Sequence, residues 1–430
     1  MSSSDRLPST RGRVEVVGLG YIGLPTAVVF AHHGWHVTGV DVNPHTVQEV
    51  NEGRLPFVEE GLESVLREVA GTTLTASTEP VGADVVIVSV PTPFGEDHVA
   101  DLRFIDAAAD SIVPVLRGGE LVVLESTVPP GATEHMARRI LSARPDLAAE
   151  DGVLEHAKVD FAHAPERVLP GRIMAELTTN DRIMGGIGQA AAQRAKDVYA
   201  TFCTGEITTT DARTAELSKL AENSFRDVNI AYANELSLVC DDLGIDVWEL
   251  ISLANRHPRV NILQPGPGVG GHCIAVDPWF IVSADREHTA LIRTAREVND
   301  AKPSWVIQRA EAVLDSLRTD TPTVAVLGLA FKPDIDDLRE SPSLAIADRL
   351  AEEFTHAKLL AVEPNITELP PVLARHDNVV LSSLEEAVAA SDMVLLLVDH
   401  TPFTQMDPKL LGARPVIDTR GLWVRGRSRR

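Results

Sequence analysis

A glycine-rich segment near the start of the chain restricts the fold more than any other feature. Residues 14–17 form a largely apolar run that predicts a buried strand, and Gly18, Gly20 and Gly23 follow it before an apolar helix over residues 26–33. In this spacing the first glycine permits a tight turn, the second lets the backbone approach a pyrophosphate, and the third lets the helix pack closely on the strand. The helix N-terminus then faces the negative charge. The segment predicts a dinucleotide-binding βαβ unit.

Asp41 identifies the dinucleotide. It ends the next expected strand, residues 37–41. A carboxylate at this point accepts hydrogen bonds from the ribose hydroxyls of NAD and repels the additional phosphate of NADP. An ordinary glycine-rich turn does not account for this acidic residue. We therefore expect NAD as the cofactor.

Strand-like and helix-like segments alternate at both ends of the chain, which predicts an α/β fold. Continuous apolar runs at residues 85–90 and 121–124 are of the kind that parallel sheets bury on both faces. A second series begins at residues 323–327 and continues at 359–362 and 393–398. Between the two series, residues 211–242 lack Gly and Pro and predict one long helix. The pattern predicts two Rossmann-like doubly wound domains joined by a central helical region.

Composition excludes several classes of protein. The net charge of -23 argues against nucleic acid or an anionic membrane surface as a partner. The chain has no apolar run of about 18 residues, and residues 1–13 lack the apolar core of a signal peptide, so we expect a cytoplasmic protein. Three scattered cysteines, Cys203, Cys240 and Cys273, are too few for a disulfide framework or a zinc cluster, and no metal is expected.

Cys273 lies at the end of a loop that is well suited to present a reactive side chain. Four of the six residues from Gly266 to Gly271 are glycine, so the backbone can wrap closely around a ligand. Such a loop is a poor place to bury a cysteine, whereas Cys203 and Cys240 are interpreted as core residues. Asp277 follows four residues later. It could position a water or a basic partner, or it could equally cap a turn or helix before Pro278.

Three polar residues share one face of the expected long helix. Lys219, Asn223 and Arg226 are spaced i, i+4 and i+7. Such a stripe is usually a solvated surface. A lysine beside a developing alkoxide would, however, stabilise the negative charge and relay protons, and Asn223 could hold a water or a sugar hydroxyl.

These motifs occur together, in this order, in one family. The glycine loop, Pro165-Glu166, Lys219 with Asn223, the Gly268–Cys273 segment with Asp277, and Phe331-Lys332 through Arg339 resemble the UDP-glucose/GDP-mannose dehydrogenase family from residue 14 to about residue 423. Residues 255–280 are most similar to the branch that acts on UDP-N-acetyl-D-mannosamine. Two positions differ from the UDP-glucose branch: Val276 stands where that branch has a lysine, and Arg167 where it has an aromatic residue.

The resemblance implies a set of binding residues and a dimer built on the long helix. Beyond the glycines, NAD would contact Tyr21, Ile22, Asp41, Thr92, Thr127 and Arg339. The UDP-sugar would be held by Arg167, Val168, Lys219, Asn223, Arg226, Gly270, Phe331 and Lys332, with Arg420 near the uridine and with His257 and Arg259 reaching it from a neighbouring subunit. The cations among these residues would form the local basic patch that an anionic substrate needs on an acidic protein.

The resemblance also implies a four-electron oxidation at C6 of the sugar. Lys219, Asn223 and Asp277 would hold a water that takes the hydroxyl proton. Cys273 would attack the aldehyde to give a thiohemiacetal, and a second oxidation would give a thioester. Glu166 resembles the family glutamate that assists hydrolysis, with Thr127 nearby. From the residues alone, Glu166 could also be a surface acid and Thr127 a strand-end hydroxyl.

Several alternatives remain open at this point. A two-electron dehydrogenase of the hydroxyacid type would need no second α/β domain, and a non-catalytic NAD-binding scaffold would leave the cysteine and lysine unused. UDP-N-acetylglucosamine and UDP-glucose remain possible substrates. The predicted divisions are a flexible N-terminus (1–12), an NAD-binding domain (13–208), a central helical dimerisation and catalytic-cysteine region (209–318), a UDP-binding domain (319–425) and a basic tail (426–430).

Overall fold

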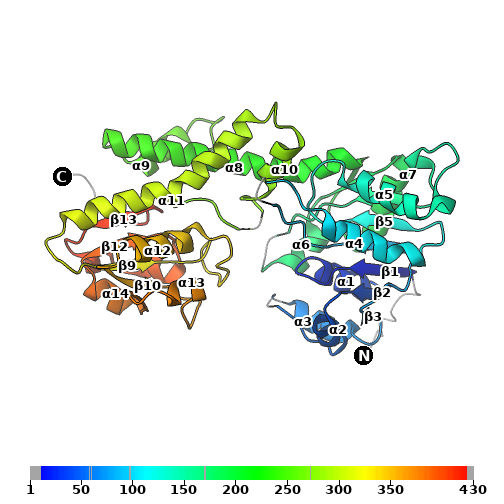
Figure 1. Cartoon of the computed structure of the whole chain (residues 1–430), viewed down its shortest axis with the longest axis horizontal. Helices are drawn as coiled ribbons and strands as arrows, with labels where there is room; N and C mark the ends of the chain where they lie inside the picture. The colour runs from blue at the N-terminus through cyan, green and yellow to red at the C-terminus, as the bar shows by residue number, and fades with distance from the viewer. Residues whose placement is uncertain are drawn as a thin grey trace, which may run out of the picture. The chain divides into compact units, whose positions relative to one another are not determined.

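The first sheet is built from residues of the N-terminal half of the chain. The computed structural model describes residues 11–57, 59, 61–95, 98–168, 171–271 and 273–423, so the predicted basic tail and most of the predicted flexible N-terminus lie outside the described residues. Eight strands are arranged in the order β3-β2-β1-β4-β5-β6-β7-β8 (Figure 1). Only the β6–β7 pair is antiparallel within this sheet. The strands are β1 (Arg13–Val17), β2 (His36–Val40), β3 (Leu74–Ser77), β4 (Val85–Val88), β5 (Leu121–Leu124), β6 (Asp160–His163), β7 (Arg182–Gly186) and β8 (Ile207–Asp211).

Helices cover this sheet because its central strands are buried on both faces. β4 and β5 contain only apolar residues, all of them buried. The first helix, α1, begins at Gly23 with Pro25 in its first turn, where the missing N–H of proline costs nothing. The helices are α1 (Gly23–His32), α2 (Pro44–Asn51), α3 (Leu62–Val69), α4 (Arg103–Ile112), α5 (Ala132–Ala143), α6 (Ile173–Thr179) and α7 (Gln189–Tyr199).

A second sheet repeats the inner strand order of the first. Five parallel strands run in the order β11-β10-β9-β12-β13, so β9 occupies the central place that β1 has in the first sheet. The prediction of two doubly wound domains is confirmed. The elements are β9 (Thr323–Leu327), α12 (Pro342–Glu353), β10 (Lys358–Val362), α13 (Pro371–Ala374), β11 (Val379–Leu381), α14 (Leu384–Ala390), β12 (Met393–Leu396), α15 (Thr401–Gln405) and β13 (Val416–Asp418).

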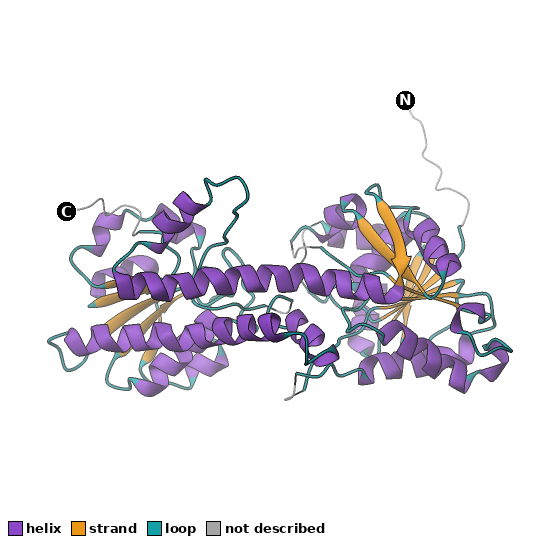
Figure 2. Ribbon diagram, turned by 90° about the horizontal axis from the view of Figure 1, so that it is seen from above, coloured by secondary structure: helices purple, strands orange, loops and turns teal. Residues whose placement is uncertain are grey.

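Two long helices connect these sheets along the chain. α8 (Ala212–Leu243) is the predicted long helix, and its C-terminal part lies beside α11 (Ala290–Ser316) (Figure 2). Buried polar pairs join the two helices: Asp227 with Arg296, Asn234 with Asn299, and Ser237 with Lys302. Within the described residues, no helix has the length and apolarity needed to cross a bilayer.

A Pro- and Gly-rich segment, residues 258–278, lies between α9 (Val247–Ala254) and α10 (Asp277–Ala284), and its composition predicts neither helix nor strand. That prediction is wrong at the end of the segment, where Asp277 and Pro278 begin α10. Proline fits there because the first turn of a helix needs no N–H from it.

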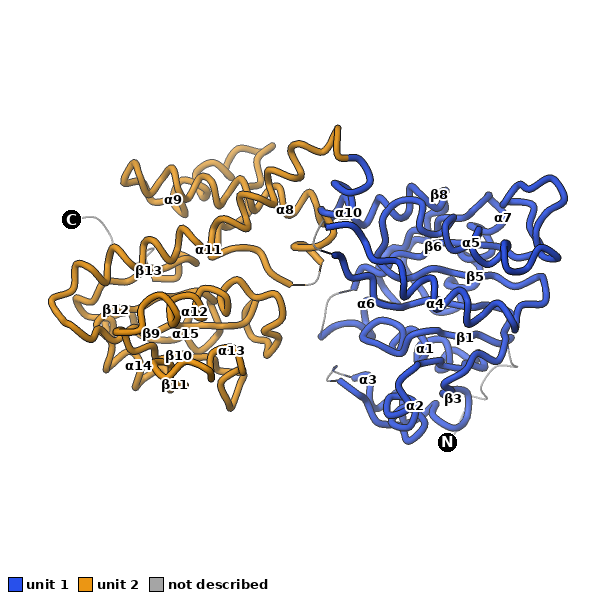
Figure 3. The backbone as a smooth tube through the Cα atoms, viewed as in Figure 1, with its two compact units in different colours: residues 1–222, 279–285 blue, residues 223–278, 286–430 orange. Residues whose placement is uncertain are grey.

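The chain divides into two compact units (Figure 3). Unit 1 contains residues 1–222 and 279–285, and unit 2 contains residues 223–278 and 286–430. The eight-stranded sheet belongs to unit 1, and the five-stranded sheet belongs to unit 2.

Candidate active site

The three glycines of the first turn have different surroundings. Gly18 has a φ of +96°, and a Cβ there would collide with the carbonyl oxygen of Ser89. A Cβ on Gly23 would collide with the carbonyl of Gly18, whereas a Cβ on Gly20 would meet nothing within 4 Å. Gly18 and Gly23 are therefore required by the fold, and Gly20 leaves open the space that a pyrophosphate needs.

Two side chains beside this loop fit a bound NAD. Asp41 is half-buried, and its two carboxylate oxygens accept hydrogen bonds from the amides of Leu19 and Asn43, both at 2.9 Å. The carboxylate is thereby oriented and keeps acceptor capacity for ribose hydroxyls. The buried Oγ1 of Thr92 has no hydrogen-bond partner among the described residues. Buried hydroxyls are normally satisfied, so this one fits a ligand contact.

Tyr21, also predicted to contact NAD, is bonded inside unit 1. Its hydroxyl donates to Oε2 of Glu59 at 2.7 Å, and its ring packs on Phe57. Glu59 is 6% exposed and also accepts the amide hydrogens of Gly171 and Ile173. The tyrosine therefore offers a cofactor its ring and backbone rather than its hydroxyl. Ile22 directly precedes α1.

Lys219 and Thr127 meet in unit 1. The lysine Nζ donates to Oγ1 of Thr127 at 2.5 Å, which joins the start of α8 to the loop after β5. Beside them, the imidazole of His163 is buried and its Nδ1 has no hydrogen-bond partner among the described residues. Burial and the positive charge of Lys219 lower the pKa of His163 to about 3, so its ring is neutral. No motif or spacing in the sequence marks His163.

Glu166 is a buried acid rather than a surface acid. It is 5% exposed, and its Oε2 accepts from Nη2 of Arg182 at 3.0 Å while its Oε1 accepts from the amide of Arg167 at 2.7 Å. A second buried carboxyl, Glu125, accepts hydrogen bonds from the hydroxyls of Thr26 and Tyr199. Burial, and after it the charge of Glu166, raises the pKa of Glu125 to about 7.

The cysteine loop is joined to α8 within unit 2. Cys273 is exposed, whereas Cys203 and Cys240 are buried as predicted. The amide of Asp277 donates to the carbonyl of Cys273 at 2.8 Å, and Oδ2 of Asp277 accepts from Nδ2 of Asn223 at 2.6 Å. Asp277 therefore both begins α10 and orients Asn223.

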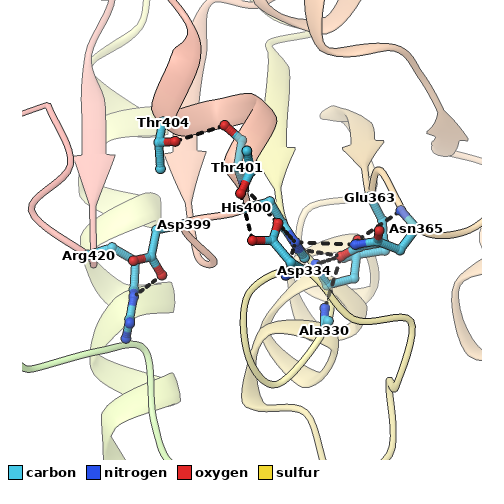
Figure 4. Close-up of polar contacts among 10 residues, drawn as sticks. Ala330, Asp334, Glu363, Asn365, Asp399, His400, Thr401, Thr404 and Arg420 are labelled. Carbon is cyan, nitrogen blue, oxygen red and sulfur yellow. Dashed lines mark hydrogen bonds and ion pairs between the residues drawn. The ribbon is translucent and has the colours of Figure 1, made fainter. Parts of the chain in front are cut away.

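Three of the predicted substrate residues gather in unit 2. A Cβ on Gly270 would lie 3.0 Å from Cβ of Phe331, and a Cβ on Gly266 would lie 2.9 Å from Nη1 of Arg420. Arg420 is oriented by Oδ1 of Asp399, which accepts from its Nε at 2.8 Å (Figure 4). The loop before Cys273 is therefore packed against Phe331 and Arg420. Lys332 follows Phe331 and is half-buried.

The other predicted residues make different contacts or are exposed. In unit 1, Nε of Arg167 lies 3.4 Å from Oε2 of Glu222, and Val168 packs on the apolar core. In unit 2, the remaining predicted residues are exposed, and Arg339 is bonded to Asp337 at 2.8 Å. These exposed residues are Arg226, His257, Arg259 and Arg339.

Three family models match the chain: the NAD binding domain of the UDP-glucose/GDP-mannose dehydrogenase family at residues 12–203, its central domain at 213–301, and its UDP binding domain at 325–425. The chain belongs to the UDP-glucose/GDP-mannose dehydrogenase family. Membership of this family confirms the predictions of an NAD-dependent oxidoreductase and of NAD as its cofactor.

Individual relatives are similar over nearly their whole length. The UDP-N-acetyl-D-mannosamine dehydrogenase of Escherichia coli K12 is 52% identical over 417 residues, covering 95% of this chain and 99% of its own. The NDP-N-acetyl-D-galactosaminuronic acid dehydrogenase of Ralstonia nicotianae is 52% identical over 411 residues, covering 95% and 96%. The solved UDP-D-ManNAc dehydrogenase of Pyrococcus horikoshii has a TM-score of 0.84 and 37% identity, covering 95% and 96%.

Proposed function

We propose that this enzyme oxidises UDP-N-acetyl-D-mannosamine at C6 to UDP-N-acetyl-D-mannosaminuronate. The main support is the 52% identity to a relative of that name across 95% of the chain. An exposed cysteine at the end of a glycine loop, in a family of NAD-dependent dehydrogenases, supports a four-electron rather than a two-electron oxidation.

The binding residues divide between the two units. In unit 1 the Gly18–Gly23 loop, Asp41 and Thr92 would hold NAD, which supplies the hydride acceptor when bound. In unit 2 Gly270, Phe331, Lys332 and Arg420 would hold the UDP moiety. Further substrate contacts are proposed for Arg167, Val168, Asn223 and Arg226, and a further NAD contact for Arg339.

The chemistry follows from the side chains that would face the sugar. Lys219, held by Thr127, and Asn223, oriented by Asp277, position a water that accepts the C6 hydroxyl proton as the hydride leaves. Sγ of Cys273 then bonds to the aldehyde carbon, and the carbonyl oxygen takes a proton. Loss of a second hydride from the same carbon, together with the hydroxyl proton, gives the thioester. Water attacks the thioester carbon, Glu166 accepts a proton from that water, and Sγ departs as thiolate. The covalent bond keeps the aldehyde from diffusing away between the two oxidations.

The stoichiometry tests this proposal. Each uronate should be accompanied by two NADH, measured by absorbance and by chromatography of the sugar nucleotides. Cys273→Ser should stall after the side chain has added to the aldehyde, because an alkoxide leaves a carbonyl far less readily than a thiolate and the resulting ester would not be hydrolysed. Cys240→Ser, in the buried core, is the matched control and should keep the ratio of two. A ratio of one in the wild type, or full turnover by Cys273→Ser, would contradict the four-electron mechanism.

A second substrate is favoured by one observation. The Ralstonia relative carries a galactosaminuronic acid name at the same 52% identity. A panel of UDP-N-acetylmannosamine, UDP-N-acetylgalactosamine, UDP-N-acetylglucosamine and UDP-glucose should give the highest kcat/KM for the first sugar, by about tenfold or more, because one mispaired hydroxyl costs roughly 1–3 kcal/mol. A higher kcat/KM for the galacto sugar would transfer the proposal to that substrate.

We also propose a homodimer formed through α8. Phe225, Tyr232 and Val239 are 68%, 52% and 47% exposed and recur every seven residues, which places them on one helical face. A second copy of the same helix offers a matching apolar stripe. His257 and Arg259, both exposed, would then contribute to the substrate site of the partner.

A further inference from the structure

The strand ends of unit 2 repeat the backbone geometry of the NAD loop in unit 1. In unit 1 the amide of Gly18 donates to the carbonyl of Val40 at 2.8 Å. In unit 2 the amide of Gly328 donates to the carbonyl of Val362, also at 2.8 Å. In both sheets a glycine therefore turns the chain over the end of the neighbouring strand.

An acidic residue follows the neighbouring strand in each unit, Asp41 after β2 and Glu363 after β10, but the two make different contacts. Asp41 in unit 1 is half-buried and accepts two amides, whereas the side chain of Glu363 in unit 2 is 0% exposed. Oε2 of Glu363 accepts from the amides of Leu329 and Ala330, at 2.8 and 3.1 Å, and from Nε2 of His400 at 3.0 Å. Its Oε1 accepts from Asn365. A carboxylate has about four acceptor sites, so Glu363 has no capacity left for a ribose.

His400 extends this network to a strained residue. Its side chain is 0% exposed, and its Nδ1 accepts the amide hydrogen of Asp334 at 2.9 Å, so its ring proton lies on Nε2 toward Glu363 (Figure 4). Asp334 has a φ of +60°, a left-handed conformation that non-glycine residues rarely adopt. The carboxylate of Asp334 also accepts from the amide and hydroxyl of Thr401, at 2.8 and 2.7 Å.

The segment between these contacts carries two proposed substrate residues. Ala330 is held by Glu363 at one end and Asp334 by His400 at the other, so residues 330–334, the 330–334 loop, are fixed at both ends. Phe331 and Lys332 lie between them. Asp399, the residue before His400, orients Arg420. The residues after β12 therefore act on two segments of unit 2: His400 contacts the 330–334 loop, and Asp399 contacts Arg420.

We propose that Glu363 and His400 are positioning residues that hold the 330–334 loop in the conformation in which Phe331 and Lys332 bind the UDP moiety. This inference rests on the proposed UDP-sugar substrate. Asp41, proposed to contact a ribose in unit 1, corresponds in position to Glu363 in unit 2, which belongs to an internal hydrogen-bond network. Glu363 and His400 would therefore affect the affinity for the nucleotide and not the chemical steps.

His400→Phe tests the role of the network. Phenylalanine keeps a ring that can pack edge-on against Phe403, as His400 does at 5.4 Å, but it removes the hydrogen bonds to Glu363 and Asp334. Titration calorimetry with UDP should show a Kd raised about tenfold or more, equivalent to ~1.4 kcal/mol. KM for the UDP-sugar should rise in parallel, while kcat stays within about threefold and the Kd for NAD is unchanged. His400→Gln, which offers an N–H to Glu363 and an oxygen to Asp334, should recover most of the affinity.

His376→Phe is the matched control. It removes another histidine–carboxylate pair of unit 2, in which His376 bonds Asp348 at 2.7 Å, and it should leave the UDP Kd at the wild-type value. A His400→Phe protein with a lower Tm but a wild-type UDP Kd would show a merely structural role and overturn the inference. Failure of the wild type to bind UDP would instead overturn the proposed substrate, so the two failures are distinguished.

Discussion

Two buried carboxyl groups in unit 1 share one guanidinium. Glu166 is hydrogen-bonded to Arg182, and Glu125 lies close enough for both to influence its pKa. Arg182 is itself 5% exposed and lies over the ring of Tyr199. The single positive charge of Arg182 offsets only one of the two carboxylate charges in this buried cluster, so the pKa of the second carboxyl, Glu125, is raised.

Glu125→Gln should change how stability depends on pH. The pKa of Glu125 is raised in the folded protein from 4.5 to about 7, so between these values the folded protein keeps a proton that the unfolded chain has released. The free energy of unfolding therefore falls as pH rises through this window, by on the order of 2–3 kcal/mol from this group. Glutamine cannot ionise, so urea unfolding of the variant at pH 5 and pH 8 should lack this decrease. An identical pH dependence in variant and wild type would contradict the assignment.

Site residues that belong to local motifs could be predicted from the sequence. Residues whose partners are distant in the chain could not. Cys273 stands out in its glycine loop, and Lys219 and Asn223 follow helical spacing. Glu125 and Arg182 lie in apolar surroundings without any spacing that marks them. Arg182 contacts an acid 16 residues away, and Glu59 contacts an amide 114 residues away. Such pairs exist only once the chain has folded, so no local pattern indicates them.

The first βα turn shows how one element divides its glycines between folding and binding. Gly18→Ala would force an L-residue into a φ of +96° and against Ser89, so we expect unit 1 to lose at least ~1 kcal/mol of stability. Gly20→Ala meets no neighbour within 4 Å and should fold normally, but its methyl group would occupy the space for the pyrophosphate.

Comparison of the two glycine variants separates these effects. The Tm of Gly20→Ala should match that of the wild type, while its Kd for NAD, measured by quenching of protein fluorescence, should rise about tenfold. Gly18→Ala should lower the Tm. Wild-type NAD affinity in Gly20→Ala would place the cofactor elsewhere.

Strong apolar strands were predictable and weak ones were not. β4, β5 and β12 are continuous apolar runs, and β1 and β9 are mostly apolar, so the positions of these strands follow from composition. β8, by contrast, reads Ile-Thr-Thr-Thr-Asp at the edge of its sheet and carries little apolar signal. β11 and β13 have three residues each, too few to establish a period.

At the scale of the whole molecule, the exposed stripe on α8 predicts the oligomeric state. Phe225→Glu with Tyr232→Glu places charges on that stripe, and burying an unpaired charge in an interface is costly. Sedimentation velocity should therefore show a dimer for the wild type and a monomer for the double variant. Leu291→Glu is the control, because Leu291 is 70% exposed on α11, and it should remain dimeric. A double variant that stays dimeric would contradict an interface at this stripe.

Mixing two inactive variants tests whether the dimer also completes the substrate site. In a two-fold dimer, a Cys273→Ser subunit paired with an Arg259→Ala subunit contains one site with an intact cysteine and the partner's intact arginine, provided that Arg259 acts across the interface. Random exchange of subunits makes half of the dimers mixed, so activity should recover to about a quarter of the wild-type value. If Arg259 acts within its own subunit, every site lacks one of the two residues, and mixing restores nothing beyond the activity of the separate variants. The same experiment with the monomeric Phe225→Glu and Tyr232→Glu background should show no recovery, because the exchange requires the α8 interface.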